Sequence, residues 1–476
     1  MLALFGACTT ILLGSLKLTA TTTVLILAAV LFVLLVTILT PIIKQGTKVL
    51  KAVSWWQVLW FLIFLSGLVF RERDVQATEA EPLDTWALFR ISLMALTAIV
   101  LLTRLSLRKT PWLQQLVRGL IAPLSAYCAI CLISSLWSVY PEWTVYKSLE
   151  FFVDVAALAA IVATATSAKT YKTLFDWTWA LTGLLLGSVW LGLFLWPQDA
   201  LVSNAVGFKG VLLSGVIPDV NPNSVGELGA ILGVVAFCRL FLRDTGKTTW
   251  ARYGFLFAVS IATMILAQGR SAIAGFAFGI FLALLFSGSF LLSFSLAAVG
   301  TVLLSIATVW QTFTGFMSRG ETESELYSLS DRVEWWALAW PKILDHPVVG
   351  YGAFAGGRFL VMAENKVDAG IHSDWVEILV GTGLLGFLMA LLVWVGTWRQ
   401  FIKSARDKSL GTLESQLLIE AIAVLGVESI RSIFTTDLFW HPPIVFFACI
   451  GFAEYLRQHQ QRDPRRFVRP ASPAAA

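Results

Sequence analysis

Three residues in the second half of the chain have side chains that could act together on an anionic leaving group: Arg270, Arg332 and His372. A neutral imidazole is the natural general base near pH 7, and the forked donors of two guanidinium groups suit a diphosphate. Arg270 also opens an apolar run, where the N–H groups of a helix start would add to its positive charge. If the chain brings the three side chains together, they would hold a diphosphate beside a base.

Each of the three residues also has an interpretation that involves no chemistry. Arg270 could extend toward lipid headgroups, Arg332 could form an ordinary ion pair with a nearby carboxylate, and His372 could be a histidine at the membrane interface. Asp374 and Glu377 follow His372 closely, and either carboxylate could orient its imidazole. Both sets of interpretations stay open at the level of the sequence.

Further polar residues stand where they could contact a substrate. Two asparagines precede an apolar run and could bind hydroxyl groups of a ligand, although they would equally well cap a helix. The spacing of Glu428 and Arg431 in another apolar run favours an intrahelical ion pair. The candidates for binding a substrate are Asn221, Asn223, Arg358, Asp374 and Glu377.

The composition indicates a membrane protein. Of the 476 residues, 57% are hydrophobic and only 14% are charged, whereas soluble domains use roughly 25% charged residues. Apolar runs of about 17–22 residues recur along the chain, and each is long enough to cross a hydrocarbon core of about 30 Å as a helix. Helices are required because lipid offers no partner for exposed backbone groups. We therefore predict an all-α, polytopic transmembrane bundle that occupies residues 1–456.

About fourteen apolar runs qualify as membrane helices, and merging short neighbours would leave about twelve. The predicted helices are residues 2–16, 21–43, 55–70, 86–103, 120–139, 151–166, 174–196, 224–242, 253–267, 271–286, 290–310, 375–396, 414–430 and 438–456.

Basic residues predict the orientation of the bundle. Lys and Arg gather in alternate interhelical loops and near the C-terminus, and such residues remain on the cytoplasmic side. Alternating fourteen helices places both termini in the cytoplasm, with residues 457–476 as a disordered tail. The opposite, outer side receives a large loop at residues 311–374, which contains an amphipathic helix at 331–344. The three residues considered first all fall on this outer side.

Several other classes of protein are disfavoured. The formal net charge of +5 comes from interhelical loops and the tail rather than from one basic face, so we expect no nucleic-acid partner. The sequence contains no P-loop, no HExxH motif and no metal-ligand cluster, so we expect no metal, no cofactor and no nucleotide-driven pump. The five cysteines fall in apolar runs, which argues against a disulfide framework.

The order of the motifs resembles that of the O-antigen ligase and polymerase family. The resemblance covers roughly residues 221–392. It is carried by Gly269-Arg270-Ser271-Ala272, by Arg332-Val333-Glu334-Trp335-Trp336, by Pro347-Val348-Val349-Gly350-Tyr351-Gly352, and by the run from His372-Ser373-Asp374-Trp375 to Gly381-Thr382-Gly383-Leu384-Leu385-Gly386.

The resemblance implies a bundle related to the GT-C glycosyltransferases. Such proteins take a glycan from undecaprenyl diphosphate at the periplasmic face of the bacterial inner membrane. They pass it to a hydroxyl of a lipid or glycan acceptor without a nucleotide sugar, and the ligases do so without an essential metal. Carried over residue by residue, Arg270 and Arg332 match the diphosphate-binding arginines and His372 matches the proposed base. Family members often have Asn after this histidine, where this chain has Ser373, so the match does not identify the acceptor.

Two other functions compete with ligation. A polymerase of the same family would add repeat units to a growing lipid-linked chain, and one sequence does not distinguish its acceptor from that of a ligase. A polytopic transporter would also have many helices and intramembrane carboxylates. It predicts repeated halves and helices broken at matching positions, and the sequence displays neither.

Overall fold

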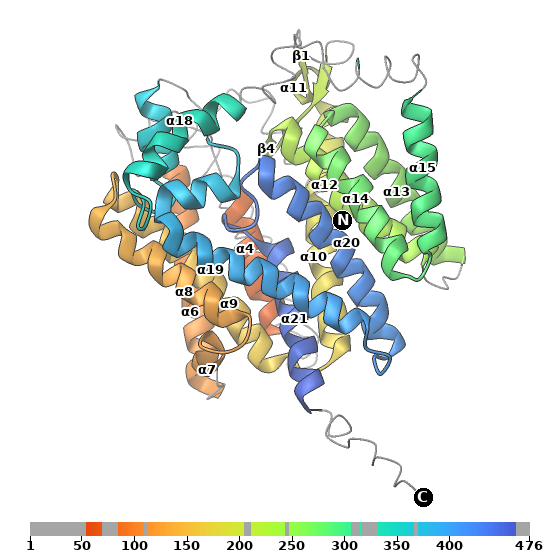
Figure 1. Ribbon diagram of the computed structural model, residues 1–476, viewed down its shortest axis with the longest axis horizontal. Helices are drawn as coiled ribbons and strands as arrows, with labels where there is room; N and C mark the ends of the chain where they lie inside the picture. Colours follow the sequence, from red (N-terminus) through yellow and green to blue (C-terminus); the bar gives the residue numbers. More distant parts are fainter. Residues whose placement is uncertain are drawn as a thin grey trace, which may run out of the picture.

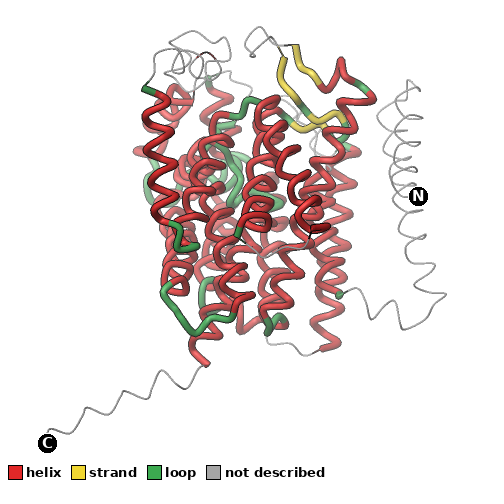
Figure 2. The backbone as a smooth tube through the Cα atoms, turned by 90° about the vertical axis from the view of Figure 1, so that its right-hand side faces the viewer, coloured by secondary structure: helices red, strands yellow, loops and turns green. Residues whose placement is uncertain are grey.

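The protein is a bundle of α-helices. The computed structural model describes residues 54–68, 84–108, 112–203, 211–242, 247–305, 315, 332–365 and 370–462. Most of the helices run side by side along one direction (Figures 1 and 2). In chain order they are α4 (Trp55–Leu68), α6 (Thr85–Arg108), α7 (Trp112–Leu116), α8 (Ile121–Ile133), the 3-10 helix η1 (Ser134–Trp137), α9 (Pro141–Thr164), α10 (Ala168–Leu195), α11 (Pro197–Ala200), α12 (Pro222–Phe241), α13 (Lys247–Ala267), α14 (Arg270–Phe286), α15 (Phe290–Leu304), α18 (Arg332–Asp345), the π-helix η3 (Gly356–Met362), α19 (Asp374–Ala405), α20 (Thr412–Phe434) and α21 (Ile444–Arg462).

The predicted fold class, an all-α membrane bundle, is confirmed. Five of the described helices are long and apolar enough to cross a membrane: Thr85–Thr103, Ala168–Leu195, Pro222–Phe241, Trp250–Ala267 and Asp374–Ala405. Each predicted apolar run from 55–70 onward corresponds to a described helix. The first two, 2–16 and 21–43, lie outside the described residues.

The last predicted helix is displaced along the chain at both ends. The apolar run starting at residue 438 predicted a helix from that point, but α21 begins only at Ile444. Pro442 and Pro443 explain the delay, because proline lacks an N–H and restricts the residue before it. Residues 435–443 are instead an irregular segment that packs inside the bundle. At its other end α21 continues to Arg462, so the beginning of the predicted tail at 457–476 is helical.

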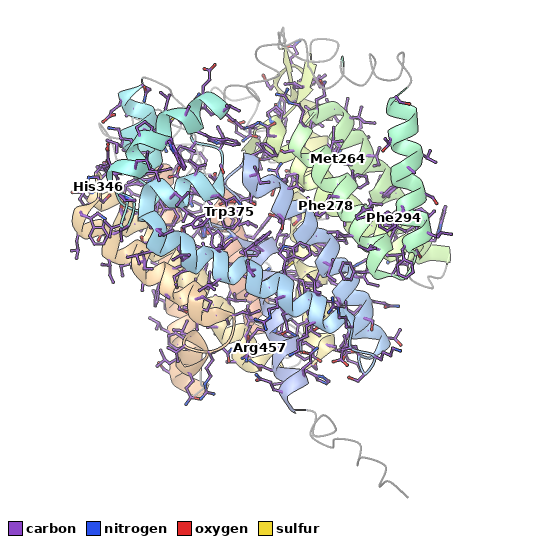
Figure 3. All side chains as sticks on the ribbon, in the orientation of Figure 1. Met264, Phe278, Phe294, His346, Trp375 and Arg457 are labelled. Carbon is purple, nitrogen blue, oxygen red and sulfur yellow. The ribbon has the colours of Figure 1, made fainter. Side chains whose placement is uncertain are left out.

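Two ends of the bundle can be distinguished. In Figure 1, α18 and the short strands lie at the upper end, while α7 and the C-terminal end of α21 lie at the lower end. Arg457, labelled in Figure 3, marks that lower end, and Trp375 lies nearer the upper one. The segments predicted to face outward are therefore at the same end, opposite the end of α21.

Four short strands at the upper end were not predicted. Leu201–Ser203 (β1) pairs antiparallel with Val211–Leu213 (β2), and Gly215–Val216 (β3) pairs with Asp219–Val220 (β4). Strands of two or three residues carry too little hydrophobic alternation to be read from a sequence. They lead directly into α12 and so fix where that helix starts.

Glycines let α14 approach α20 closely, as the GxxxG spacing in the sequence suggests for a membrane helix. A Cβ on Gly275 would lie 3.1 Å from the Val427 carbonyl oxygen, and one on Gly279 would lie 2.8 Å from the Ala423 carbonyl oxygen. Larger side chains at either position would push the two helices apart. This contact matters for the candidate site because it holds the start of α14 near the end of α20.

A break in α19 anchors the loop that follows α18. Gly383 has a φ of 60° and is non-helical within α19, and a side chain there would collide with the backbone of Val348. The loop uses the backbone groups that the break exposes: the Leu384 N–H donates to the Pro347 carbonyl at 2.8 Å, and the Tyr351 N–H donates to the Val380 carbonyl at 2.9 Å. The two glycine-rich motifs of the sequence are thus hydrogen-bonded to each other.

The large predicted loop at 311–374 is described only in part. Its helix, predicted at 331–344, is observed as α18, Arg332–Asp345. Trp336, Ala339 and Ile343 of α18 pack in a small core with η3 and the start of α19. Apart from Gly315, residues 306–331 lie outside the described residues.

Candidate functional site

Two of the three residues considered first are close enough to affect each other. Arg332 is the first residue of α18, and His372 lies just before α19. The Trp335 ring, one turn along α18, lies 5.4 Å from the His372 ring with 36° between their planes. The His372 backbone has a φ of 52°, which is uncommon for a residue with a side chain. The loop and the start of α19 therefore hold the imidazole in a defined position beside α18.

The surroundings of His372 keep its imidazole neutral. Burial and then the positive charge of Arg332 lower its pKa from 6.5 to about 4, while the Asp437 carboxylate acts in the opposite direction. Both of the larger effects disfavour the imidazolium ion, since an apolar setting and a like charge penalise a cation. At pH 7 the ring is therefore an acceptor of protons.

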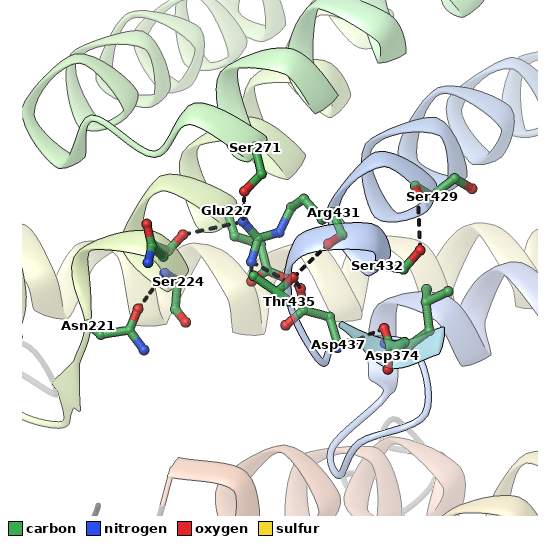
Figure 4. Close-up of polar contacts among 12 residues, drawn as sticks. Asn221, Ser224, Glu227, Ser271, Asp374, Ser429, Arg431, Ser432, Thr435 and Asp437 are labelled. Atoms are coloured by element: carbon green, nitrogen blue, oxygen red, sulfur yellow. Dashed lines mark hydrogen bonds and ion pairs between the residues drawn. The ribbon is translucent and has the colours of Figure 1, made fainter. Parts of the chain in front are cut away.

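Arg431 organises the polar cluster beside His372. Its guanidinium group is fully buried. Nη2 donates to the Glu227 carboxylate at 2.6 Å and to the Asp437 carboxylate at 3.0 Å, while Nη1 donates to the Ser271 hydroxyl at 3.4 Å (Figure 4). Thr435 also donates its hydroxyl to Asp437. Arg431 thereby ties together α12, α14 and the segment after α20.

Arg270 lies at the edge of this cluster. It is the first residue of α14 and is directly followed by Ser271, the residue that accepts from Arg431. Arg431 joins Ser271 to Asp437, the carboxylate whose charge acts on the imidazole. These contacts bring the start of α14 to the cluster, and they were not predicted from the sequence.

Glu428 and Arg431, predicted to pair, act on each other by charge but form no direct ion pair. Arg431 donates instead to Glu227 and Asp437, which lie in α12 and in the segment after α20. Glu428 is buried, and its Oε1 has no hydrogen-bond partner among the described residues. Spacing along a helix identifies possible partners on that helix only, and here groups on other elements satisfy the guanidinium better.

Asp374 has a structural function in this arrangement. Its carboxylate accepts the backbone N–H groups of Asp437 and Leu438 at 3.0 Å each and that of Phe439 at 3.4 Å. It is buried at the first turn of α19. Asp374 therefore fixes the segment that carries Asp437, and its contacts with that backbone replace the predicted orienting contact with His372.

Glu377 and Arg358 approach each other on the side of α19 that faces η3. Glu377 accepts the backbone N–H of Gly357 and lies close enough to Arg358 to be stabilised by its charge. The Arg358 guanidinium lies over the rings of Trp143 and Phe359, at 5.4 and 5.5 Å from their centroids. Asp374 and Glu377 both line a narrow pocket with Tyr127, Phe354, Phe439 and Trp440.

Asn221 caps a helix, as one of its two interpretations predicted, and Asn223 contributes its backbone carbonyl to the polar cluster. The Asn221 side chain accepts the Ser224 N–H at 2.9 Å and so caps α12. The Asn223 carbonyl accepts from Arg431 at 3.4 Å. The start of α12 is thus part of the polar cluster, while the Asn221 carboxamide is used as a helix cap.

A second buried network was missed by sequence reasoning. Glu150 accepts from Arg90 at 2.6 and 3.0 Å and from Lys147 at 2.9 Å. Nearby, the His441 ring lies between the Asp154 carboxylate at 2.7 Å and the Ser66 hydroxyl at 2.8 Å. The available signal was the presence of charged residues within apolar runs, since such residues are costly in lipid unless they are paired. That signal marks the residues but does not identify their partners.

The described residues contain no group of three or more His, Cys, Asp or Glu side chains that could hold a metal ion. Cys128, Cys131, Cys238 and Cys449 are all buried, and none of them forms a disulfide with another described residue.

The fold and the site define a multi-pass membrane protein with a histidine, arginines and carboxylates gathered at one end of a helical bundle. The family model described as O-antigen ligase matches residues 255–391, from within α13 to within α19. This match confirms the predicted resemblance to the O-antigen ligase and polymerase family. It also indicates an enzyme of the inner membrane that acts like a glycosyltransferase in polysaccharide synthesis. Comparison with curated proteins gave no match.

Proposed function

We propose that the protein is a membrane glycosyltransferase of the O-antigen ligase type. It transfers a glycan from undecaprenyl diphosphate to an acceptor hydroxyl at the periplasmic face. The observation that carries this proposal is the setting of His372, a neutral imidazole held between Trp335 and the charges of Arg332 and Asp437. Arg270, Arg332 and His372 all fall within the residues that match the family.

The proposed reaction is a single displacement. The acceptor oxygen attacks the anomeric carbon of the donor, and the bond from that carbon to the diphosphate oxygen breaks. The electron pair leaves with the diphosphate, and the acceptor proton passes to His372. Arg270 and Arg332 offset the charge that develops on the leaving diphosphate. Such electrostatic stabilisation is usually the largest single contribution to catalysis. The configuration at the anomeric carbon is inverted.

Binding of the donor would itself strengthen the base. The positive charge of Arg332 is one reason why the pKa of His372 is only about 4. A diphosphate on Arg332 would offset that charge and raise the pKa of His372 toward its usual value, because a nearby anion favours the imidazolium ion. The base would therefore gain strength only when a donor is present.

The periplasmic placement is supported by the charges at the two ends of the bundle. Arg399 and Lys403 are exposed near the end of α19, and Arg457 lies in α21 at the end opposite the candidate site. A surplus of basic residues marks the cytoplasmic side of a membrane protein. The end that carries Arg332 and His372 would then face the periplasm.

Transfer by the purified protein in lipid nanodiscs tests the proposal. With a lipid-linked glycan donor and a lipid acceptor, His372→Ala, Arg270→Ala and Arg332→Ala should each lose most of the transfer. His459→Ala and Arg399→Ala are matched controls, because both residues are exposed and lie away from the candidate site. Full transfer by the three site variants would refute the proposed roles.

The same donor, used in nanodiscs and in sealed vesicles, separates ligase, polymerase and transporter. A ligase requires the lipid acceptor and leaves the donor unchanged without it. A polymerase, the alternative within the family, lengthens the lipid-linked chain when only donor is supplied. A transporter moves the lipid-linked glycan across the bilayer of a vesicle without changing its length.

A further inference from the structure

The exposed surface of α18 is divided into an apolar stripe and a polar stripe. Apolar residues recur along the helix at spacings of four, three and four, which places them on one side. This apolar stripe consists of Val333, Ala337, Trp340 and Leu344. Three of these side chains are large, and they are 45%, 57% and 61% exposed in chain order. The polar stripe beside it carries Glu334, Lys342 and Asp345, with one apolar residue among them, Leu338, which is 36% exposed.

The apolar stripe is distinct from the side of α18 that packs on the protein. Trp336, Ala339 and Ile343 already bury a third side of the helix against η3 and the start of α19. The Trp336 indole N–H donates to the Ile371 carbonyl at 3.1 Å, which fixes the rotation of the helix. An exposed stripe with two large aliphatic side chains and a tryptophan is thus left on a helix whose packing side is occupied.

The apolar stripe continues onto the lipid-facing surface of a membrane helix. Val348, four residues beyond Leu344, is 53% exposed, and its carbonyl accepts the Leu385 N–H at 3.2 Å. Leu385, Leu388 and Leu392 of α19 are in turn 46%, 42% and 53% exposed. Because α19 is long and apolar enough to span the membrane, these leucines face lipid. Exposed apolar side chains therefore recur from the spanning helix through Val348 to α18.

The position of α18 fits the edge of a bilayer. The helix lies across the upper end of the bundle, above α8 and α19 (Figure 1). Trp137 of η1 is 40% exposed and donates its indole N–H to the Val349 carbonyl at 3.2 Å, so an exposed tryptophan lies at the same level. Tryptophan is enriched where membrane meets water, and helices with one apolar and one polar side lie in that plane.

We propose that α18 is an interfacial helix whose apolar stripe inserts into the bilayer leaflet on the side of the candidate site. The polar stripe then faces water, and the buried side stays on the protein. Phospholipid acyl chains near the headgroups are the partner, because the stripe is continuous with surface that already faces them.

Insertion would set the depth of the candidate site. Arg332 and Trp335 belong to α18, so a helix held in the interface places them at the level of the lipid headgroups. A diphosphate attached to a polyprenyl chain lies at that same level and could reach Arg332 sideways from the bilayer. This consequence depends on the proposed function, whereas the insertion of α18 does not.

Site-directed spin labelling tests the insertion directly. Ala337→Cys and Leu344→Cys place a nitroxide on the apolar stripe, and Glu334→Cys and Asp345→Cys place one on the polar stripe of the same helix. Each labelled protein is put singly into a phospholipid nanodisc, so that a second copy cannot cover the stripe. The unsubstituted chain, carried through the same labelling, gives the background from native cysteines. Power saturation then compares collisions with oxygen, which concentrates in lipid, and with a water-soluble nickel chelate.

We expect oxygen collisions to dominate at 337 and 344 and nickel collisions to dominate at 334 and 345. Nickel collisions that dominate at all four positions would overturn the proposal, because α18 would then lie in water. Equal profiles on the two stripes would overturn it as well, because the helix would have no preferred side. Glycosyl transfer is not measured, so a failure of the proposed function would leave this result unchanged.

Discussion

Replacement of Arg332 by glutamine should strengthen the imidazole base of the free protein while weakening binding of the donor. The lowering of the His372 pKa from 6.5 to about 4 corresponds to about 3 kcal/mol against the imidazolium ion. Burial is the larger cause and remains in the variant, so we expect Arg332→Gln to raise the His372 pKa above 4 but to recover less than half of the lowering. Arg332→Lys keeps the charge and should leave the pKa near 4.

Hydrogen–deuterium exchange at the imidazole C2 position, read by mass spectrometry, measures this pKa in nanodiscs. The rate of that exchange reports the protonation state of each histidine separately. The exposed His459 gives an internal reference in the same sample. Lys342→Gln is a second control, because it removes a positive charge from the same helix without being a cause of the His372 shift.

Kinetics give the complementary result. In plots against pH, the acid limb of kcat/KM reports the pKa of the base in the free enzyme, and the acid limb of kcat reports its pKa in the enzyme with bound substrate. We expect the limb of kcat/KM near pH 4 and that of kcat at higher pH, because the bound diphosphate offsets Arg332. An unchanged His372 pKa in Arg332→Gln, or equal limbs for kcat and kcat/KM, would refute this electrostatic coupling.

Three further outcomes follow from particular contacts. Gly383→Ala should lower the free energy of unfolding by about 2 kcal/mol or more, measured by thermal denaturation, because a positive φ and the Val348 backbone both oppose a side chain. Arg431→Met should lower the free energy of unfolding by about 3–5 kcal/mol, because it leaves buried carboxylates unpaired. Glu428→Gln should change that free energy little, because the Glu428 Oε1 has no hydrogen-bond partner among the described residues. The pKa of His372 is lower in the folded than in the unfolded protein, so its contribution to the free energy of unfolding is fully present above pH 6.5. That contribution falls by up to about 3 kcal/mol toward pH 4. His372→Gln should therefore flatten this part of a plot of melting temperature against pH.

The sequence alone was sufficient to predict those features of the fold that a single physical rule determines. Hydrophobic length identified α4, α6, α8, α9, α10, α12, α13, α14, α15, α19 and α20 with boundary errors of up to about ten residues, the largest at the start of α9. Charge distribution predicted that the loop at 311–374 lies opposite the C-terminal end, and α18 of that loop lies at the end of the bundle opposite Arg457. These predictions needed no knowledge of which helices touch.

The contacts that build the site could not be predicted, because they join residues far apart in sequence. Asp437 follows α20 by a few residues, and nothing in its local sequence shows that Asp374 binds its backbone or that Arg431 binds its carboxylate. The intrahelical pairing predicted for Arg431 failed for the same reason. The break in α19 was likewise hidden, because a glycine within an apolar run is equally compatible with an unbroken membrane helix.

Polar contacts, rather than apolar packing, set the relative positions of the elements at the site. Apolar helix surfaces tolerate sliding, whereas a hydrogen bond is made at one register only. Here Arg431 fixes α12 and α14 to the segment after α20, Asp374 fixes that segment to α19, and the break at Gly383 fixes the loop after α18 to α19. His372 and Arg332 are thus held by contacts that precede substrate binding, which is the arrangement that lowers a reaction barrier most effectively. Removing the contacts of Arg431 or Asp374, or the break at Gly383, should therefore reduce kcat more than it raises KM.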